Sequence, residues 1–401
     1  MYCGYKKLFS WLTVFILYGI NLFAQNTWLP KQNFPGINRD DAVGFSLQGY
    51  GYCGTGMDVG FQLSNDFWKF DPVNNSWTQV ADFAGTKRQY CSSFTINNIA
   101  YVVSGIDING VYQNDIWAYD GSANSWAIKN PIPGIGRSGG VAFAINDKGY
   151  TGTGNTGSGY LNDWWEYDPV TDSWTQRTSF PGSPRFVASA FSIGVKGYVG
   201  TGKDSANQLL NDFWEYDAVS DAWLQKNSFP GSARNYAEGF SINQFGYIGC
   251  GLDVNGDYKN DFYAYNQFSD SWIPVASLPA TSRKGGACFV INNKAFYGTG
   301  IDSSNTRLND WWEYTSLTGI SEFEKNDFIL IYPNPSHGKF TIQLAKNKNS
   351  DLKIFNSAGK IVFEKNSLTD NLISTTFLTK GIYYCQIRID EKYFSEKIII
   401  Y

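Results

Sequence analysis

The chain has 401 residues, a formal net charge of −4, 17% aromatic residues and 41 glycines. Its charges are dispersed, which excludes a basic face for nucleic acid or for an anionic membrane surface. Since one motif recurs at a fixed short interval, the length indicates a single large repeat domain with appended segments.

Residues 1–24 have the features of a secretory signal. Lys6 and Lys7 precede the apolar run LFSWLTVFILYGINLFA, which ends at the small residue Ala24. A charged start, an apolar stretch shorter than a comfortable membrane span and a small residue at its end predict cleavage and export. An uncleaved membrane anchor is the alternative. No other segment is expected to span a membrane as a helix once the signal is removed.

Three series of residues repeat in step between positions 25 and 318. Nearly the same seven residues, as in NDWWEYD at 162–168, occur six times at intervals of 48 or 49 residues. A tryptophan series and an arginine series follow the same intervals, which predicts one structural unit per interval. The tryptophans are Trp28, Trp77, Trp126, Trp174, Trp223 and Trp272, and the arginines are Arg39, Arg88, Arg137, Arg185, Arg234 and Arg283.

Each repeat consists of short runs of alternating apolar and polar residues, so each is expected to form four antiparallel strands. In the run that begins with Asn-Asp, the third residue is always apolar and lies on the opposite face from the aromatic fourth and sixth residues. A strand that is apolar on both faces must be covered on both, as in blades stacked around an axis. The prediction is an all-β, six-bladed β-propeller over residues 25–318, with the tryptophan series as structural packing residues.

The ends of the repeat region are out of register with each other. The tryptophan series starts before the first Asn-Asp segment, whereas no tryptophan follows the last of these segments, which begins at Asn309. The segment around Thr27–Gln32 is therefore expected to supply the outer strand of the sixth blade, paired with the strand that contains Trp311 and Trp312. Such pairing removes two open sheet edges at once.

The repeats resemble those of kelch-type six-bladed propellers over residues 25–318. The resemblance rests on paired aromatic residues such as Trp117 and Tyr119, on the tryptophan of each repeat and on Pro-x-x-x-Arg, as in PGSPR before Phe186. The adjacent glycine pair of that family is replaced here by Gly-x-Gly, as at Gly152 and Gly154.

A second domain is expected at residues 328–401, after a linker at 319–327. Runs such as FILIYPNPSHGKFTIQL and FLTKGIYYCQIRI alternate like strands and are joined by Asn, Gly and Lys turns, which predicts a small antiparallel β-sandwich. The segment resembles the C-terminal sorting domain of the type IX secretion pathway of Bacteroidetes-type bacteria. The matching motifs are YPNPS-x-G-x-F at Tyr332–Phe340, AGK at Ala358–Lys360 and GIYY at Gly381–Tyr384, while Asn356 stands where that family usually has aspartate.

This second resemblance implies the destination of the protein. The tail would engage the secretion machinery, the chain would cross both membranes, and the tail would then be removed. The propeller would be secreted or held at the outer-membrane cell surface. An ordinary accessory sandwich is the alternative.

Residue types that commonly build metal and catalytic sites are scarce. His337, in the tail, is the single histidine, so the propeller has no imidazole for acid–base catalysis or metal binding. The run that starts at Asp253 begins like an EF-hand loop but has Ala264 at its twelfth position. The cysteines beyond the signal show no paired spacing and are expected to be small buried residues; they are Cys53, Cys91, Cys250, Cys288 and Cys385. No metal and no cofactor is predicted.

The arginine series lies just after the loop that precedes the first strand of each blade. The loop between the second and third strands opens on the same face and begins with an aspartate in five repeats, whereas the third repeat has Thr156. Each arginine either pairs with the loop aspartate or the Asn-Asp aspartate of its own blade, or belongs to a set that binds an anionic ligand group. Under the second interpretation, Arg137 is the best single candidate. The loop aspartates are Asp58, Asp107, Asp204, Asp253 and Asp302.

Glu238 lies on the predicted innermost strand, where the other repeats have Val43, Ser92, Val141, Ser189 and Ala287. It either lines a solvated channel or, in a desolvated site, has a raised pKa suited to acid or base chemistry.

The predicted function is that of a secreted or surface-displayed propeller that binds a glycan or a protein through the arginine-bearing face, without covalent chemistry of its own. One alternative is a lyase, epimerase or hydrolase acting on acidic sugars, with Glu238 and Tyr236 as proton carriers. Another is a structural spacer that binds nothing. The fold alone favours none of these.

Overall fold

The computed structural model describes residues 26–316 and, in the C-terminal part, residues 329–332, 336, 340–344, 350–356, 360–368, 372–375, 378–389 and 392–400. The chain divides into two compact units, with the boundary between Thr318 and Gly319. Among the described residues the secondary structure is entirely β, and the strands pair in antiparallel sheets. The predicted signal and linker lie outside the described residues.

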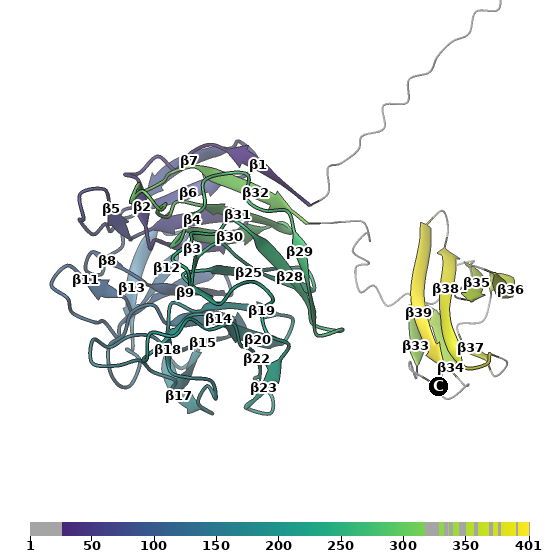
Figure 1. Ribbon diagram of the computed structural model, residues 1–401. Helices are drawn as coiled ribbons and strands as arrows, with labels where there is room; N and C mark the ends of the chain where they lie inside the picture. The colour runs from purple at the N-terminus through teal and green to yellow at the C-terminus, as the bar shows by residue number, and fades with distance from the viewer. Residues whose placement is uncertain are drawn as a thin grey trace, which may run out of the picture. The chain divides into compact units, whose positions relative to one another are not determined.

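The first unit is a ring of six four-stranded sheets, the blades, which confirms the predicted all-β propeller (Figure 1). The first strands of neighbouring blades contact one another and surround the central channel. From the innermost strand outward, the blades are β3 (Val43–Leu47), β4 (Tyr50–Gly54), β6 (Phe67–Asp71) and β7 (Ser76–Val80); β9 (Ser92–Ile96), β10 (Ile99–Val103), β12 (Ile116–Asp120) and β13 (Ser125–Lys129); β14 (Val141–Ile145), β15 (Lys148–Gly152), β16 (Trp164–Asp168) and β17 (Ser173–Arg177); β19 (Ser189–Ile193), β20 (Lys196–Gly200), β22 (Phe213–Asp217) and β23 (Ala222–Lys226); β25 (Glu238–Ile242), β26 (Phe245–Gly249), β28 (Phe262–Asn266) and β29 (Ser271–Val275); and β30 (Ala287–Ile291), β31 (Lys294–Gly298), β32 (Trp311–Thr315) and β1 (Thr27–Lys31).

The sixth blade is completed by the N-terminal strand, as the register of the repeats predicts. Strand β1 pairs with β32 so that Trp28 lies opposite Tyr314 and Lys31 lies opposite Trp311 (Figure 1). The indole of Trp28 is buried and donates a hydrogen bond of 2.9 Å to the carbonyl of Ala276, in the segment after the fifth blade. The two ends of the repeat region are thereby joined, and β32 is not left as an open edge.

The hydrophobic core is divided into clusters that lie between neighbouring blades. The cluster of Phe45, Tyr52 and Phe67 with Val102 and Tyr119, for example, joins the first blade to the second. The third and sixth residues of every Asn-Asp segment are almost completely buried in these clusters, because each blade covers one face of the next. Those residues are Phe67, Ile116, Trp164, Phe213, Phe262 and Trp311, and Phe70, Tyr119, Tyr167, Tyr216, Tyr265 and Tyr314.

The tryptophan series links consecutive blades through main-chain hydrogen bonds. The indole N–H of Trp77 donates to the Gln32 carbonyl at 3.0 Å, and that of Trp223 donates to the Thr178 carbonyl at 3.0 Å. Apart from Trp28, the members of this series are half-buried rather than fully enclosed. Their rings pack at the outer rim against the aromatic residues of the neighbouring blade, as Trp77 packs on Trp311 at 5.1 Å between ring centroids.

Short pairings fix one face of the propeller. The arginine-bearing segment before the first strand pairs with the start of the loop between the second and third strands, which places both on a face that we call the arginine face. These pairs are β2 (Arg39–Asp40) with β5 (Met57–Asp58), β8 (Arg88–Gln89) with β11 (Ile106–Asp107), β18 (Arg185–Phe186) with β21 (Lys203–Asp204), and β24 (Arg234–Asn235) with β27 (Leu252–Asp253). Single bridges, Ser138 to Asn155 and Lys284 to Ile301, occupy the same places in the third and sixth blades.

In the described part of the C-terminal unit the strands form two antiparallel sheets, as expected for the predicted small sandwich. Its buried side chains include Leu352, Ile354, Cys385, Ile387 and Ile398, which alternate along their strands as in a sheet with one face in a core. One sheet contains β33 (Ile329–Tyr332), β34 (Phe340–Leu344) and β37 (Leu372–Thr375), and the other contains β36 (Ile361–Leu368), β35 (Ser350–Asn356), β38 (Gly381–Ile389) and β39 (Lys392–Ile400).

Candidate functional site

Every arginine of the series forms a buried ion pair with the aspartate of the Asn-Asp segment in its own blade. Arg39, for example, donates to both carboxylate oxygens of Asp66 at 2.6 and 2.8 Å and to the Thr55 carbonyl at 2.9 Å. All six guanidinium side chains are at most 1% exposed. The pairs are Arg39–Asp66, Arg88–Asp115, Arg137–Asp163, Arg185–Asp212, Arg234–Asp261 and Arg283–Asp310, with closest N–O distances of 2.5 to 2.7 Å.

In four of the six repeats, those of Arg39, Arg88, Arg185 and Arg234, a phenylalanine and a glycine before the arginine suit this burial. In FPGSPR, the ring of Phe180 lies 4.6 Å from the guanidinium carbon of Arg185, and a Cβ added to Gly182 would lie 2.6 Å from the Arg185 Nη2 atom. Burial alone would raise the pKa of Asp212, but the hydrogen bond and charge of Arg185 outweigh it and hold that pKa below its usual range. The geometry therefore supports the interpretation in which each arginine serves its own blade, and binding of a ligand by the series stays a prediction.

The loop aspartates were considered as partners of the arginines, but they hydrogen-bond within their own loops instead. The Asp58 carboxylate accepts hydrogen bonds from the backbone N–H groups of Gly60 and Gln62, at 2.8 and 3.0 Å, and so shapes its own loop. In the third blade, Asn155 accepts the equivalent bond from Gly157 at 2.8 Å. The lack of a loop aspartate therefore leaves Arg137 paired with Asp163 like the others. Arg137 differs in one respect, because its buried Nε has no hydrogen-bond partner among the described residues.

A closed ring of main-chain hydrogen bonds surrounds the channel at the arginine face. It is formed by the residue two positions after each arginine, whose N–H donates to the carbonyl of its counterpart in the preceding blade over 2.8 to 3.5 Å. All members have φ between +47° and +62°, a conformation that favours glycine. The members of this main-chain ring are Asp41, Tyr90, Gly139, Val187, Tyr236 and Gly285.

The main-chain ring holds three polar side chains together at the channel entrance. The hydroxyl groups of Tyr90 and Tyr236 are 3.3 Å apart, and the Tyr90 hydroxyl also hydrogen-bonds the carboxyl group of Asp41. A Cβ at Gly285 would lie 2.4 Å from Asp41 Oδ1, so this glycine leaves the space that the carboxyl group occupies. Together these side chains line a cavity of about 120 Å³, the mouth cavity, whose lining also includes Val187 and Glu238.

Aromatic and charged groups flank the mouth cavity. Phe186 packs edge-on against Tyr90 and Tyr236, with ring centroids 5.5 and 6.1 Å away. The Lys284 ammonium lies over the ring of Tyr236 at 4.9 Å from its centroid. Burial, together with the adjacent charge of Asp40, raises the pKa of Asp41 well above its usual value. The carboxyl group of Asp40 is itself paired with Arg307, whose Nε lies 2.5 Å from Asp40 Oδ1.

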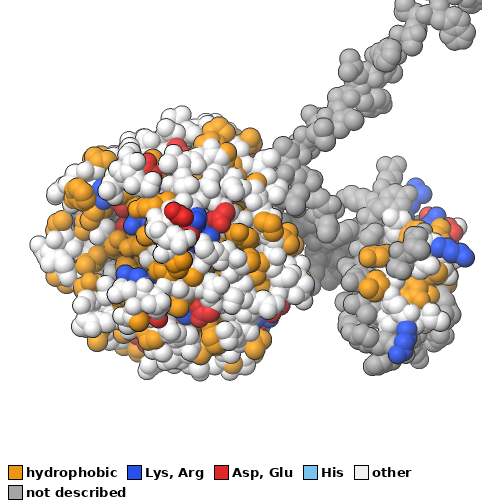
Figure 2. Space-filling model, viewed as in Figure 1, with side chains coloured by type: hydrophobic (Ala, Val, Ile, Leu, Met, Phe, Trp, Pro, Cys, Tyr) orange, Lys and Arg blue, Asp and Glu red, His pale blue; other side chains and the backbone are white. Residues whose placement is uncertain are grey.

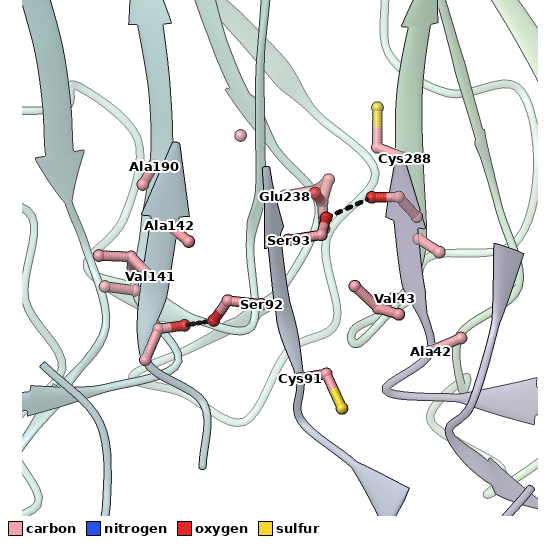
Figure 3. Close-up of a pocket in the computed structure, with 15 residues that line it drawn as sticks. Ala42, Val43, Cys91, Ser92, Ser93, Val141, Ala142, Ala190, Glu238 and Cys288 are labelled. Atoms are coloured by element: carbon pink, nitrogen blue, oxygen red, sulfur yellow. Dashed lines mark hydrogen bonds between the residues drawn. The ribbon is translucent and has the colours of Figure 1, made fainter. Parts of the chain in front are cut away.

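Glu238 connects the mouth cavity to the channel beneath it. It is the first residue of β25 and lines both the mouth cavity and a channel cavity of about 230 Å³. Figure 3 shows it among Ser93, Val141 and Cys288. No hydrogen-bond or ion-pair partner of Glu238 occurs within the described part of the chain, and burial raises the pKa of its carboxyl group from 4.5 to about 8.

The serine hydroxyl groups of the channel wall are already committed to the main chain. Ser92 donates to the Gly140 carbonyl at 2.6 Å and Ser93 to the Gly44 carbonyl at 2.8 Å, as the dashed lines in Figure 3 show. The remaining lining consists of Ala, Gly, Val and two cysteines, so Glu238 is the single acidic or basic residue in the channel cavity. Its isolation explains the raised pKa, since nothing in the wall stabilises the ionised form.

The structure brings Glu238 and Tyr236, the two residues considered as proton carriers, to the same mouth cavity. It adds Asp41 and Tyr90, which the repeat pattern did not single out. A signal was present, because the position two residues after the arginine is glycine at Gly139 and Gly285, which is typical of a left-handed backbone.

Metal-binding groupings do not arise in the described ranges. No cluster of three or more His, Cys, Asp or Glu side chains suited to a metal ion occurs there. The Asp253 carboxylate accepts two backbone N–H groups of its loop and pairs with Lys259 at 2.7 Å. Four of the five described cysteines are buried, and none of the five forms a disulfide. His337 lies outside the described residues.

Comparison with known proteins identifies the tail and the fold. Residues 330–401 match the family model for the secretion system C-terminal sorting domain. A solved structure entitled "Structure of YjhT" aligns with a TM-score of 0.61 at 18% sequence identity, covering 70% of this chain and 95% of that one, and this likeness concerns the fold alone. No curated protein matches the chain. The kelch assignment remains a prediction.

The sorting domain establishes where the protein acts. It marks a protein that the type IX system exports to the cell surface or beyond, which confirms the predicted localisation and implies contact with the secretion machinery. No helix in the described ranges is long and apolar enough to cross a membrane. The candidate site is therefore the mouth cavity of an exported propeller.

Proposed function

We propose that the propeller is a binding protein whose ligand, a glycan or a protein, docks on the arginine face over the mouth cavity. The observation that carries this proposal is the main-chain ring, which holds Asp41, Tyr90 and Tyr236 around an accessible cavity. Four members of that ring are not glycine, yet they adopt left-handed backbone conformations that cost about 1 to 3 kcal/mol each. Strain of this kind is typical of binding and catalytic sites.

The surroundings of the mouth cavity also favour binding. The loops between the second and third strands, which open on the arginine face, expose large apolar side chains. Phe61 is 67% exposed, and Val59, Ile108, Val111 and Val254 are each more than half exposed. Figure 2 shows apolar side chains spread over the visible side of the propeller, with acidic and basic side chains between them. Exposed apolar groups around a polar cavity are typical of surfaces that recognise a partner.

Binding can be tested with arrays of defined probes. Full-length protein would be applied to a glycan array and to a peptide array, beside the double variant Tyr90→Ala/Tyr236→Ala. We expect a subset of probes to bind the wild type and to lose binding in the double variant. Val219→Ser serves as the control, because Val219 is 82% exposed in a turn between third and fourth strands, which belongs to the opposite face. Equal loss in the control, or no bound probe on either array, would contradict the proposal.

A catalytic function has one observation in its favour, the unpaired Glu238 with its raised pKa beside Tyr236 in the mouth cavity. Such a carboxyl group is suited to proton transfer near neutral pH. A turnover screen on uronic and sialic acids followed by mass spectrometry tests this candidate. Product that disappears in Glu238→Gln would support an enzyme acting on acidic sugars. Binding without product would support the function as a binding protein. If neither binding nor product were detected, the structural spacer would be the alternative that stands.

A further inference from the structure

We propose that the channel entrance receives a primary alkylammonium group, the side chain of a lysine on a partner protein, with the ammonium placed against Glu238. This inference rests on the proposed binding function and specifies the chemistry of the ligand. It follows from three properties of the mouth and channel cavities, namely their charge, the polarity of their walls and the aromatic collar above them.

The carboxyl groups of the two cavities have no basic counterpart in the lining. Asp41 and Glu238 are the acidic residues among their lining residues, and neither lining contains a lysine or an arginine. The nearest cations are engaged elsewhere, because Arg307 pairs with Asp40 and Lys284 lies over the rings of Tyr236 and Tyr258. A cationic group entering the channel would meet an unpaired carboxyl group in a confined site, where a charge-assisted hydrogen bond is strong.

The walls leave room for a slender, unbranched side chain. Between the main-chain ring and Glu238, the lining consists of small residues such as Ala42, Ala188 and Gly140. The hydroxyl groups of Ser92 and Ser93 already donate to main-chain carbonyls and have no hydrogen left to offer a guest. A lysine side chain is slender enough to pass between these small residues, and its ammonium group can donate to the polar atoms that make up most of the exposed lining of the channel cavity.

The aromatic collar favours the same guest. Tyr90, Phe186 and Tyr236 pack together at the entrance, and aromatic faces attract alkylammonium groups. The chain itself provides an example, since the Lys284 ammonium lies 4.9 Å from the Tyr236 ring centroid. The exposed apolar side chains of the surrounding loops, such as Phe61 and Val111, would contact the protein that bears the inserted lysine. These observations favour a protein lysine over an amino sugar.

Small probes on the full-length protein test the inference directly. Butylammonium and Nα-acetyl-lysine methylamide carry the ammonium group, while butanol and the Nε-acetylated lysine derivative keep the stem without the charge. Calorimetric titration is expected to detect the two cations and not the two neutral probes. Their binding by Glu238→Gln is expected to be at least about tenfold weaker, the loss that corresponds to one charge-assisted hydrogen bond.

A matched variant separates local recognition from general attraction to an acidic face. Asp257→Asn removes one exposed acidic charge from a loop of the same face, and it is expected to change affinity by no more than about twofold. Lys284→Gln removes the nearby cation and is expected to strengthen binding. Equal binding of charged and neutral probes would overturn the inference, as would unchanged affinity in Glu238→Gln. The comparison of charged with neutral probes needs only the wild type, so it does not depend on the folding of any variant.

The inference and the proposed function fail in different ways. If array probes bind and depend on Tyr90 and Tyr236 while butylammonium does not bind, the binding function stands and the lysine inference is wrong. If lysine-containing peptides on the array bind and the same peptides with acetylated lysine do not, both are supported. If neither arrays nor cations give binding, both are wrong.

Discussion

The buried arginines are expected to affect stability more than binding. In Arg185→Ala the carboxylate of Asp212 keeps its partly buried place without a cation, and the Thr201 carbonyl loses a hydrogen bond. Removal of one partner from such a pair destabilises a protein by about 3 to 5 kcal/mol. Chemical denaturation would measure this change. Lys148→Ala, which breaks the more exposed pair with Asp168, is the control and should change stability by about 1 kcal/mol or less.

The same comparison decides between the two interpretations of the arginine series. Arg137 is the informative member, since its Nε lacks a partner among the described residues. If Arg137→Ala abolished ligand binding while its free energy of unfolding matched that of the wild type, the structural interpretation would be wrong. We expect the opposite result, a large loss of stability, because Arg137 donates to both oxygens of Asp163 at 2.5 and 2.7 Å.

Glu238 should make the stability of the propeller depend on pH. Its pKa is about 8 in the folded protein against an ordinary value of 4.5, so the folded state holds a proton that the unfolded state releases between these values. The contribution of Glu238 to the free energy of unfolding should therefore be greatest below about pH 4.5 and should fall as the pH rises to about 8. In Glu238→Gln the fall between pH 5 and pH 8.5 should be smaller by an amount on the order of a few kcal/mol. Urea denaturation at the two pH values measures it, and an unchanged difference would contradict the isolated state of this carboxyl group.

Residue spacing predicted the arginine face and the channel, but it did not predict the main-chain ring at the centre of the site. The arginine and aspartate series locate the arginine face, and the departure of Glu238 from its neutral counterparts marks the channel. The partner of each arginine was left open between two aspartates, because strand pairing alone does not show which carboxylate the guanidinium reaches. The main-chain ring was not predicted, since Asp41, Tyr90, Val187 and Tyr236 take positive φ without being glycine.

At the scale of single elements, the closing strand β1 is expected to govern the stability of the ring. Trp28 packs against Tyr314 and Phe262, with ring centroids 4.9 and 5.1 Å away, and its indole bonds to the Ala276 carbonyl. Trp28→Ala should destabilise the propeller by about 3 to 5 kcal/mol, as expected for a buried aromatic residue. Leu29→Ala is the control on the same strand, because Leu29 is 50% exposed, and its effect should stay within about 0.5 kcal/mol. Equal effects in thermal denaturation would show that closure does not depend on this ring.

The same strand shows why repeat phase was a reliable guide to the fold. The order of strands in a blade follows from alternation, but closure depends on which end supplies the missing outer strand. The tryptophan before the first repeat settled that question, and the observed pairing of Trp28 with Tyr314 confirms it. A detail that spacing did not predict is the Lys31 contact with Glu313 at 2.5 Å, in which the glutamate is buried.

At the scale of the whole molecule, the ring is closed by its own N-terminal strand, and the strands described in the sorting tail pair only with one another. A chain that ends at Thr318 should therefore keep the propeller fold. We expect residues 26–318 to unfold at the same urea concentration and with the same cooperativity as the propeller transition of the full chain, because all six inter-blade clusters lie within this range.

Removal of residues 26–31 from the same truncated chain is the matched control. It opens the sixth blade at β32 and should lower the midpoint, since it exposes a strand edge and the cluster around Tyr314. A lower midpoint for residues 26–318 than for the full chain would mean that the propeller depends on the tail, and the two units would then have to be treated as one cooperative structure.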